Sequence, residues 1–122
     1  MSTGARKSLG RLGEQLAAEH FERLGWRIVA RNHQTRFGEL DLIAADGDVL
    51  VFCEVKTRRL PAGDAWGSLH ESKQGQVRRM AQAWLRDVTD RPRFAEIRFD
   101  AIGVLVDARG GLVRLDHLER AF

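Results

Sequence analysis

Hydrophobic and polar residues follow a helical spacing in two separate stretches of the chain. In the first, from Ser8 to Leu24, leucine and phenylalanine recur at steps of three to five residues, which gives the segment one apolar side. Ser8 is a suitable N-cap, and Gly25 suits the position just past the helix. The second stretch runs from about Glu71 to Val88. Its expected buried stripe consists of Val77, Met80, Ala81, Trp84 and Val88.

Shorter apolar runs outside these two helices have the character of β-strands. Residues 26–30 form a short, partly β-branched run, residues 94–106 form a long one, and residues 112–115 form a last one. The polar residues 31–37 and the segment 57–69, which contains proline and two glycines, are expected to be loops.

A β-hairpin is expected in the first half of the chain. Residues 38–45 and 48–56 flank Asp46-Gly47, and Asp-Gly between two apolar runs is the strongest short-range hairpin signal. Because the second run is apolar on both faces from Val49 to Cys53, we expect it in the middle of a sheet. The element order is then α-β-β-β-α-β-β. This order predicts an α/β fold with a central mixed sheet and one helix on each face.

The composition fits one small globular domain. The chain has 122 residues, 43% of them hydrophobic and 30% charged, with a net charge of +3, which suffices for one core but not for two. Residues 1–7 are expected to form a flexible tail and residues 8–122 a single domain. No apolar run approaches the ~20 residues of a membrane-spanning helix. Cys53 is the only cysteine, so we expect no disulfide framework. Residues 1–10 have no apolar core of a secretory signal, so we expect a cytoplasmic location and no membrane contact.

Four charged residues interrupt the predicted hairpin. On a strand, residues i and i+2 share a face, so Glu39 and Asp41 share one face, and Glu54 and Lys56 share one face. With a two-residue turn, Glu39 lies opposite Glu54 and Asp41 lies opposite Phe52, and all four charged side chains project to one side. A four-residue turn keeps this arrangement, whereas a three-residue turn divides it unless a bulge intervenes.

The chemistry of this cluster points to a divalent cation. Neighbouring carboxylates repel one another and raise one another's pKa. Mg²⁺, with Mn²⁺ as its substitute, relieves this repulsion and is commonly held by one or two carboxylates, waters and a phosphate. Lys56 could then stabilise developing charge or orient a water, a combination suited to phosphodiester hydrolysis. The ordinary alternative is a strand-end ion pair of Glu54 and Lys56 beside solvated carboxylates.

The residues just described resemble those of known families. A helix with a glutamate, a strand with an aspartate and a strand with Glu-x-Lys are similar to the PD-(D/E)-x-K nuclease superfamily of restriction-endonuclease-like folds, with archaeal-type Holliday junction resolvases as the nearer branch. More closely, the chain resembles the YraN-type family of uncharacterised proteins. The matching stretches are residues 10–26, Arg31-Asn32, GELDLIA (38–44), VFCEVKTR (51–58), Lys73 with the helix after it, RFDAI (98–102) and residues 121–122.

The resemblance implies roles for individual residues. Asp41 and Glu54 are implied to be the Mg²⁺ ligands and Lys56 the catalytic lysine, and the position before Asp41 is leucine where the superfamily motif has proline. Glu14 lies on the edge of the apolar side of the first helix. By the same resemblance it supports the metal site, as Glu39 does. The alternative for Glu14 is a surface glutamate favoured by the helix dipole.

Basic residues around the cluster are candidates for binding phosphates. Arg36, Arg58 and Arg59 are expected on flanking loops. Lys73 continues the apolar stripe of the second helix at its N-terminal end, where its ammonium group would meet a carboxylate or a phosphate. Gln74 is a weaker candidate beside it. The alternative for Lys73 is a solvent-exposed residue in the first turn.

Two further residues are expected to be structural. Cys53 lies inside the central strand and is interpreted as a small buried hydrophobe rather than a reactive thiol. Asp100 lies in the long strand and is interpreted as a buried or strand-end carboxylate that braces an arginine.

The sequence therefore favours a Mg²⁺-dependent nuclease that acts on DNA rather than RNA, with branched or otherwise structured DNA as the expected substrate. Two alternatives stay open: a non-enzymatic nucleic-acid-binding module, and an interaction protein that uses the fold as a scaffold. Resolvase-like enzymes act as dimers, so the resemblance also implies a homodimer, although no self-complementary patch is evident in the sequence.

Overall fold

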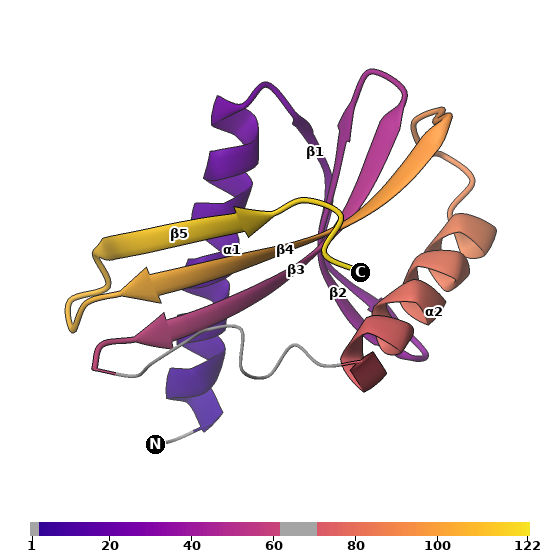
Figure 1. Cartoon of the computed structure of the whole chain (residues 1–122). Coiled ribbons are helices and arrows are strands. Elements are labelled where there is room, and N and C mark those ends of the chain that lie inside the picture. Colours follow the sequence, from indigo (N-terminus) through magenta and orange to yellow (C-terminus); the bar gives the residue numbers. More distant parts are fainter. Residues whose placement is uncertain (1–2, 62–70) are drawn as a thin grey trace.

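A computed structural model of the chain describes residues 3–61 and 71–122. Within these ranges two helices and five strands follow one another in the order predicted from the sequence (Figure 1). Their bounds are α1 Thr3–Arg23, β1 Arg27–Thr35, β2 Gly38–Asp46, β3 Val49–Arg59, α2 Glu71–Asp87, β4 Glu96–Val106 and β5 Leu112–Leu118.

The five strands form one mixed sheet in the order β1-β2-β3-β4-β5. Strands β3 and β4 are parallel, and the other neighbours are antiparallel. The parallel pair is connected through α2, as a parallel crossover requires. Strand β3 lies in the middle, as its doubly apolar sequence predicted. The α/β architecture with a central mixed sheet is confirmed and is consistent with a restriction-endonuclease-like fold.

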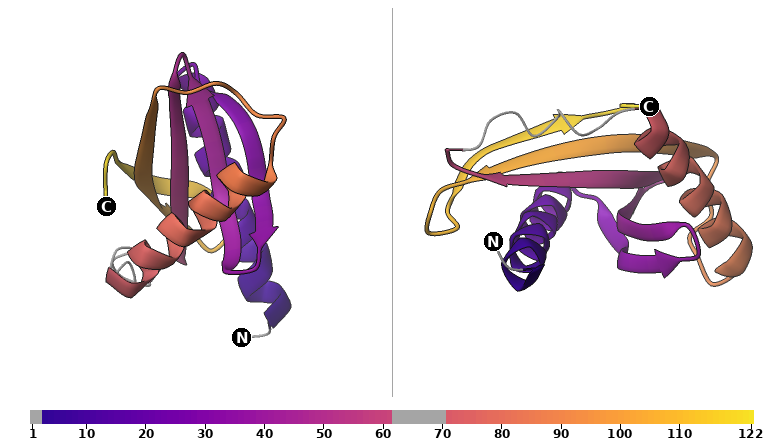
Figure 2. Two further views of the ribbon diagram at one scale, coloured as in Figure 1. Left: turned by 90° about the vertical axis from the view of Figure 1, so that its right-hand side faces the viewer. Right: turned by 90° about the horizontal axis from the view of Figure 1, so that it is seen from below.

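The two helices cover opposite faces of the sheet. Helix α1 packs on a cluster that includes Val51 and Cys53, whereas α2 packs on a cluster that includes Leu50 and Phe52. These are alternate residues of β3, and alternate residues of a strand point to opposite faces. Figure 2 shows α1 and α2 on the two sides of the strands. Cys53 is buried as expected, and burial raises the pKa of its thiol well above the ordinary value.

The buried stripe of α2 agrees with the prediction. Val77, Met80, Ala81 and Trp84 are each 2% exposed or less, and Trp84 meets Phe52 edge to face with ring centroids 5.8 Å apart. Val88 lies just past the helix end and packs on the same cluster while partly exposed. The stripe therefore anchors α2 to the middle of the sheet.

Helix α1 differs from its prediction at both ends. It begins at Thr3, so Ser8 lies inside the helix and is not its N-cap, and residues 3–7 are helical where a tail was expected. Leu24 was placed on the apolar side but is 55% exposed, because the helix has already ended at Arg23.

Gly25 has the predicted place just beyond α1. Its φ of 92° lies in the left-handed region, and its N–H donates to the Glu22 carbonyl at 3.0 Å. The Trp26 N–H donates to the Phe21 carbonyl at 3.0 Å, which completes a Schellman motif. The Phe21 and Trp26 rings meet edge to face at 5.6 Å, so the end of the helix is closed by a hydrophobic contact.

The first strand is longer than predicted, since β1 runs to Thr35 through residues expected to form a loop. Those polar residues pair with β2 at an edge of the sheet, from Arg31 opposite Leu42 to Thr35 opposite Gly38. An edge strand with polar side chains shows no strong hydrophobic alternation, which explains the error. Strands β3 and β5 also extend further than predicted, to Arg59 and Leu118. Residues 62–69 of the expected loop lie outside the described ranges.

The register of the β2–β3 hairpin is displaced from the predicted one by two positions. Asp46 pairs with Val49 around a Gly47-Asp48 turn, and Phe52 lies opposite Ile43 rather than Asp41. Gly47 has a φ of 58°, which suits the first central position of a two-residue hairpin turn. Because the displacement is even, the paired residues 42–46 and 49–53 point to the predicted faces. Beyond the ladder the prediction of one common side does not hold: Glu54 alternates with Phe52 on the α2 face, whereas Glu39 contacts Arg11 of α1.

Strands β2 and β3 separate beyond this hairpin. Their ladder ends at the pair Leu42–Cys53, after which β2 remains paired with β1 as far as Gly38 and β3 remains paired with β4 as far as Arg59. In Figure 2 the β1–β2 hairpin leaves the layer formed by β3, β4 and β5. The separation, which we call the fork, begins between Asp41 and Glu54. In the described ranges, no helix has the length and apolar character needed to span a membrane.

Candidate metal centre at the strand fork

Asp41 occupies the start of the fork. Its Oδ2 accepts a hydrogen bond from the backbone N–H of Val55 at 2.9 Å, two residues past Cys53, the last residue of β3 that pairs with β2. A carboxylate therefore accepts from a backbone group just where the two strands stop pairing. This contact fixes the Asp41 side chain between β2 and β3.

Glu54 is the close neighbour of Asp41. Glu54 is only 4% exposed and directly precedes Val55 on β3. Burial, followed by the negative charge of Glu54, raises the pKa of Asp41 well above its ordinary value, and a side-chain hydrogen bond with Glu54 acts in the same direction. Asp41 is partly exposed and Glu54 is buried, and two ionised carboxylates in contact repel each other. A cation at this place would relieve that repulsion.

Glu14 and Glu39 form the other part of the site. Arg11 Nη1 donates to Glu14 Oε1 at 2.9 Å and to Glu39 Oε1 at 3.0 Å. Asn32 Nδ2 donates to the same two oxygens, at 2.6 Å and 3.3 Å. Carboxylate oxygens of Glu14, Glu39 and Asp41 lie within 4.8 Å of one another, so α1 and β2 contribute to one cluster.

A glycine allows α1 to come this close to the sheet. A Cβ atom on Gly13 would lie 1.7 Å from Thr57 Oγ1, a separation that no side chain tolerates. Helix α1 therefore lies directly against β3, and the next residue, Glu14, reaches the cluster with 8% of its surface exposed. Glu14 is therefore buried and is not the surface glutamate of the alternative interpretation.

Asn32 has an uncommon backbone conformation. Its φ is 52°, in the left-handed region that asparagine adopts more readily than most residues. The irregularity in edge strand β1 aims the Asn32 amide at Glu14 and Glu39. Strained backbone at a polar cluster of this kind is typical of functional sites.

Lys56 follows Glu54 by two residues on β3 and therefore lies on the same face of the strand. Its side chain is partly exposed. Among the ion pairs between described residues, those nearest the site join Arg11 to Glu14 and Glu39, and none involves the Lys56 ammonium group.

The predicted phosphate-binding residues are only partly gathered. Arg36 stacks on Phe37 at 4.8 Å from the ring centroid and is exposed at the β1–β2 turn, and Arg58 is partly exposed on β3. Arg59 instead donates to the carbonyls of Asp107 and Ala108 at 3.3 Å and 2.9 Å, which ties β3 to the β4–β5 turn. Both Arg58 and Arg59 lie on a strand and not on a loop.

The remaining candidates lie in the first turns of α2. Gln74 is partly exposed there. Lys73 belongs to the helix, but its side chain lies outside the described part of the structure, so its predicted contact with a carboxylate or phosphate stays a prediction.

Two residues of the cluster were not identified from the sequence. Arg11 stands three residues before Glu14 in α1, a helical spacing that brings the two side chains together. Asn32 lay in a segment predicted to be a loop. A glutamate–arginine pair within a helix usually indicates a surface ion pair, and only the fold reveals that Arg11 also reaches Glu39.

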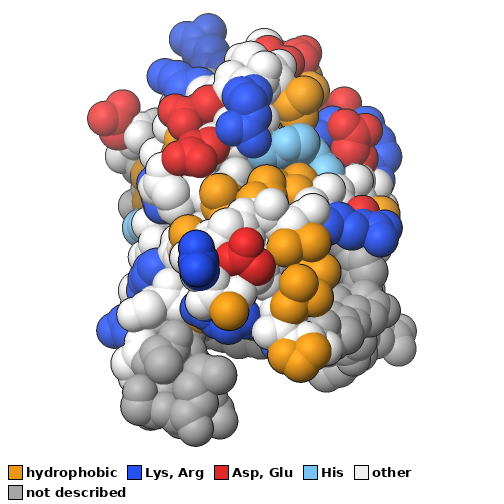
Figure 3. Space-filling view, turned by 90° about the vertical axis from the view of Figure 1, so that its left-hand side faces the viewer, with side chains coloured by type: hydrophobic (Ala, Val, Ile, Leu, Met, Phe, Trp, Pro, Cys, Tyr) orange, Lys and Arg blue, Asp and Glu red, His pale blue; other side chains and the backbone are white. Residues whose placement is uncertain are grey.

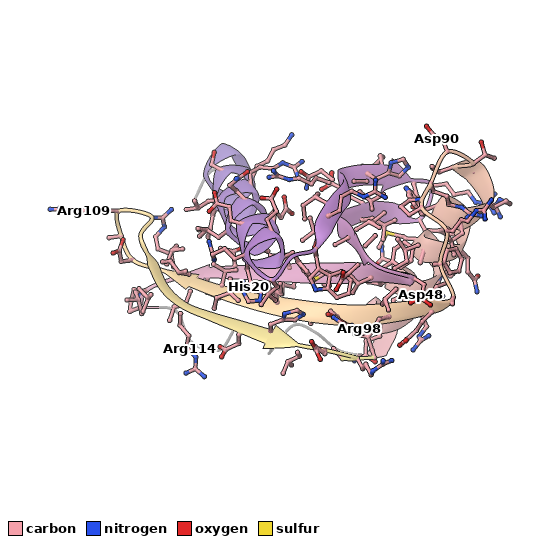
Figure 4. All side chains as sticks on the ribbon, turned by 90° about the horizontal axis from the view of Figure 1, so that it is seen from above. His20, Asp48, Asp90, Arg98, Arg109 and Arg114 are labelled. Atoms are coloured by element: carbon pink, nitrogen blue, oxygen red, sulfur yellow. The ribbon has the colours of Figure 1, made fainter. Side chains whose placement is uncertain are left out.

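A second polar cluster lies on the α1 side of β4 and β5. Asp100 is fully buried and accepts from Arg98 at 2.9 Å and 2.8 Å, which confirms that it braces an arginine. His117 Nε2 lies 2.6 Å from Asp100, and its Nδ1 lies 3.1 Å from His20 Nε2 of α1. Figure 4 shows His20 on the side of α1 that faces the sheet, with Arg98 on β4 nearby. These contacts tie α1 to the two last strands.

The amino-acid sequence is similar to those of a known protein family. Residues 13–104 match the model of "Uncharacterised protein family UPF0102". A UPF0102 protein of Pelotomaculum thermopropionicum is 45% identical over 97% of this chain and 98% of its own length. UPF0102 proteins of Streptomyces griseus and Dictyoglomus turgidum are 44% and 36% identical, over 89% and 95% of this chain and 92% and 98% of their own lengths. The chain therefore belongs to the UPF0102 family.

Proposed function

We propose that this protein is a Mg²⁺-dependent nuclease that hydrolyses phosphodiester bonds in DNA, with branched or otherwise structured DNA as the favoured substrate. One observation carries the proposal: the Asp41 carboxylate is held at the fork beside Glu54, and Lys56 follows on the same strand. Glu54 and Lys56 interrupt the otherwise apolar β3, and Asp41 meets them from the neighbouring strand β2. The resemblance to the PD-(D/E)-x-K superfamily supports the same assignment.

The donor set suits Mg²⁺ or Mn²⁺. Hard divalent cations prefer carboxylate oxygens, and Asp41 and Glu54 offer them in a half-enclosed position without histidine or thiolate ligands among them. The raised pKa of Asp41 indicates that its negative charge is poorly compensated by the protein, which favours a cation there. When bound, such an ion polarises a phosphate oxygen and lowers the pKa of a bound water.

The side chains have separate tasks in this proposal. Asp41 and Glu54 hold the cation, and the Val55 N–H keeps Asp41 oriented toward it. The Lys56 ammonium orients the attacking water or stabilises the charge that develops on the phosphate. Glu14 and Glu39 support the metal or its waters from α1 and β2. Arg36 and Arg58, with Lys73 and Gln74, contact the phosphates of the substrate.

A nuclease screen tests the proposal. Wild-type protein is incubated with branched, flapped and linear DNA and with RNA, with Mg²⁺, with Mn²⁺ or with EDTA, beside Lys56→Ala. We expect cleavage of DNA that requires the metal and is lost in Lys56→Ala. Salt-sensitive DNA binding without cleavage in any metal would contradict the proposal and favour a non-enzymatic binding module. Absence of DNA binding even at low salt would favour an interaction protein.

A further inference from the structure

The Arg11 guanidinium is placed where a cation would be expected. Its Nη1 lies 2.9 Å from Glu14 Oε1 and 3.0 Å from Glu39 Oε1, and its Nη2 lies 3.4 Å from Glu39 Oε2. One positive group thus joins two carboxylates that come from a helix and a strand far apart in the sequence. Without it, the two negative groups would face each other across a short gap.

The surrounding geometry is that of a cation site with one side already filled. Glu14, Glu39 and Asp41 each place an oxygen within 4.8 Å of the others, a spacing that one ion could bridge. Asn32 Nδ2 donates to the same Oε1 atoms of Glu14 and Glu39 as Arg11 does. The lone pairs that would face an ion on this side are therefore directed at protein donors. Asp41, in contrast, accepts the backbone N–H of Val55 and contacts Glu54, and none of its contacts with described residues is with a cationic group.

The contacts divide the cluster into two parts. Arg11 and Asn32 both donate to Glu14 and to Glu39, so these two carboxylates already have protein donors, one of them always positively charged. Among the described contacts, the Asp41 carboxylate accepts from the backbone N–H of Val55 and from no cationic group. A divalent ion therefore binds more favourably beside Asp41 than beside Glu39.

We propose that Arg11 is a built-in cation of the metal centre: it occupies the Glu14–Glu39 side of the cluster and limits the site to a single divalent ion on Asp41 and Glu54. The inference rests on the proposed function for the identity of that single ion's ligands. Arg11 is a positioning residue in this scheme, because it acts through the two glutamates and not on the substrate. Glu14 and Glu39 then shape the site and bind its waters without binding a second metal.

Mn²⁺ titration of the purified full chain, followed by calorimetry and by the paramagnetic resonance of free Mn²⁺, tests this role. Wild type is expected to bind one ion per chain, and Arg11→Gln to bind two. In Glu54→Gln we expect no ion, whereas Arg11→Gln combined with Glu54→Gln restores one, held by Glu14, Glu39 and Asp41. Arg11→Lys, which keeps the positive charge, binds one. Arg86→Gln is the matched control, since Arg86 is exposed on α2 and pairs only with Asp87 among the described residues.

The outcomes separate this inference from the proposed function. If Arg11→Gln and wild type bind Mn²⁺ with equal stoichiometry and affinity, or if wild type already binds two ions, the role of Arg11 is refuted while cleavage by wild type is unaffected. If wild type binds no ion and Arg11→Gln binds one, the role of Arg11 stands and the Asp41–Glu54 site is wrong. Circular dichroism establishes that each variant is folded, and Arg11→Lys supplies the comparison if Arg11→Gln is not.

Discussion

The side chain of Asp41 accepts a hydrogen bond from the backbone N–H of Val55 at 2.9 Å, just past the last paired residues of β2 and β3. This carboxylate therefore both satisfies a backbone donor and carries a poorly compensated charge. The two tasks can be separated by substitution, because asparagine keeps an acceptor and loses the charge.

Asp41→Asn is expected to stabilise the protein while abolishing metal binding and cleavage. The pKa of Asp41 is raised in the folded state, so ionisation of Asp41 lowers the free energy of unfolding whenever the pH lies above the ordinary carboxyl pKa of 3.8. The gain should be present at neutral pH, fade as the pH falls through the raised folded-state pKa, and be absent below 3.8. A gain of about 1 kcal/mol would raise the Tm by roughly 3–6 °C for a chain of this size.

Thermal unfolding in EDTA at neutral and at acidic pH measures this effect. Asp41→Ala is the control, because it removes the charge and also leaves the Val55 N–H without its acceptor, which costs about 1–3 kcal/mol. A lower Tm for Asp41→Asn at neutral pH would show that the negative charge is compensated in the folded protein, contrary to the cluster described above.

Lys56→Ala should lose cleavage without losing stability. Removing a group that stabilises charge in the transition state typically lowers kcat by about 10²–10³. The ammonium makes no described contact, so the free energy of unfolding should change by less than about 0.5 kcal/mol. Initial rates on the best substrate of the screen, with urea unfolding alongside, check both parts. Equal losses of activity and stability would assign Lys56 a structural role.

Gly13→Ala should destabilise the protein and weaken metal binding together. The added Cβ would lie 1.7 Å from Thr57 Oγ1, so α1 must move away from β3, at a cost of about 1–3 kcal/mol. Because Glu14 is the next residue, the displacement also moves its carboxylate. Thr57→Ala in the same chain should recover part of the stability, since it removes the nearest atom.

Gly10→Ala is the matched control for that experiment. Gly10 also lies in α1, but nothing stands within 4 Å of the Cβ it would gain. We expect it to stabilise the helix by about 0.5–1 kcal/mol, the usual advantage of alanine over glycine. Similar effects of the two alanines on urea unfolding would mean that α1 does not rest on β3 at Gly13.

The histidine pair between α1 and β5 predicts a loss of stability in mild acid. Burial, and then the charges of His117 and Arg23, lower the pKa of His20 from its ordinary 6.5. As the pH falls below 6.5, the unfolded chain takes up a proton that the folded chain resists, so the folded state becomes less stable. His20→Gln should flatten this part of the stability profile, measured by urea unfolding between neutral pH and the carboxyl range.

A further loss is expected at lower pH from Asp100. Although burial opposes it, the hydrogen bonds from His117 and Arg98 lower the pKa of Asp100 below 3.8. Its stabilisation is therefore complete above that value and disappears as the pH falls through the folded-state pKa. Figure 3 shows histidine side chains beside hydrophobic ones on one face of the molecule. His20 and His117 are each partly exposed, so protons reach the pair from solvent. For the His20 prediction, a free energy of unfolding that still falls in His20→Gln between neutral pH and the carboxyl range would assign that loss to other groups.

The long apolar elements could be predicted because their patterns are set by burial. The stripe of α2 and the doubly apolar β3 follow directly from the sequence. The edge strand β1 could not, because its residues 31–35 are polar and their pairing depends on β2. The turn of the hairpin was misplaced by one residue, since Asp-Gly alone does not say which of its neighbours is the second turn position.

The carboxylates of the candidate site could be predicted from the sequence, whereas the side chains that donate hydrogen bonds to them could not. Asp41, Glu54 and Lys56 stand out because charged residues in an apolar strand have no packing reason to be there. Arg11 and Asn32 do not stand out, because an arginine in a helix and an asparagine in a polar segment are ordinary. Their importance comes from the approach of α1 to β1 and β2, which depends on tertiary contacts far apart in sequence.

The fork divides the sheet into two wings, which pair with each other only in the β2–β3 ladder from Leu42–Cys53 to Asp46–Val49. One wing, β1 with the outer half of β2, carries Asn32, Glu39 and Asp41, and the other, β3 to β5, carries Glu54 and Lys56. An ion held by Asp41 and Glu54 would span the seam between them. A bound ion would therefore hold β2 and β3 together where no backbone-to-backbone ladder connects them. Its binding should slow the separation of these two strands.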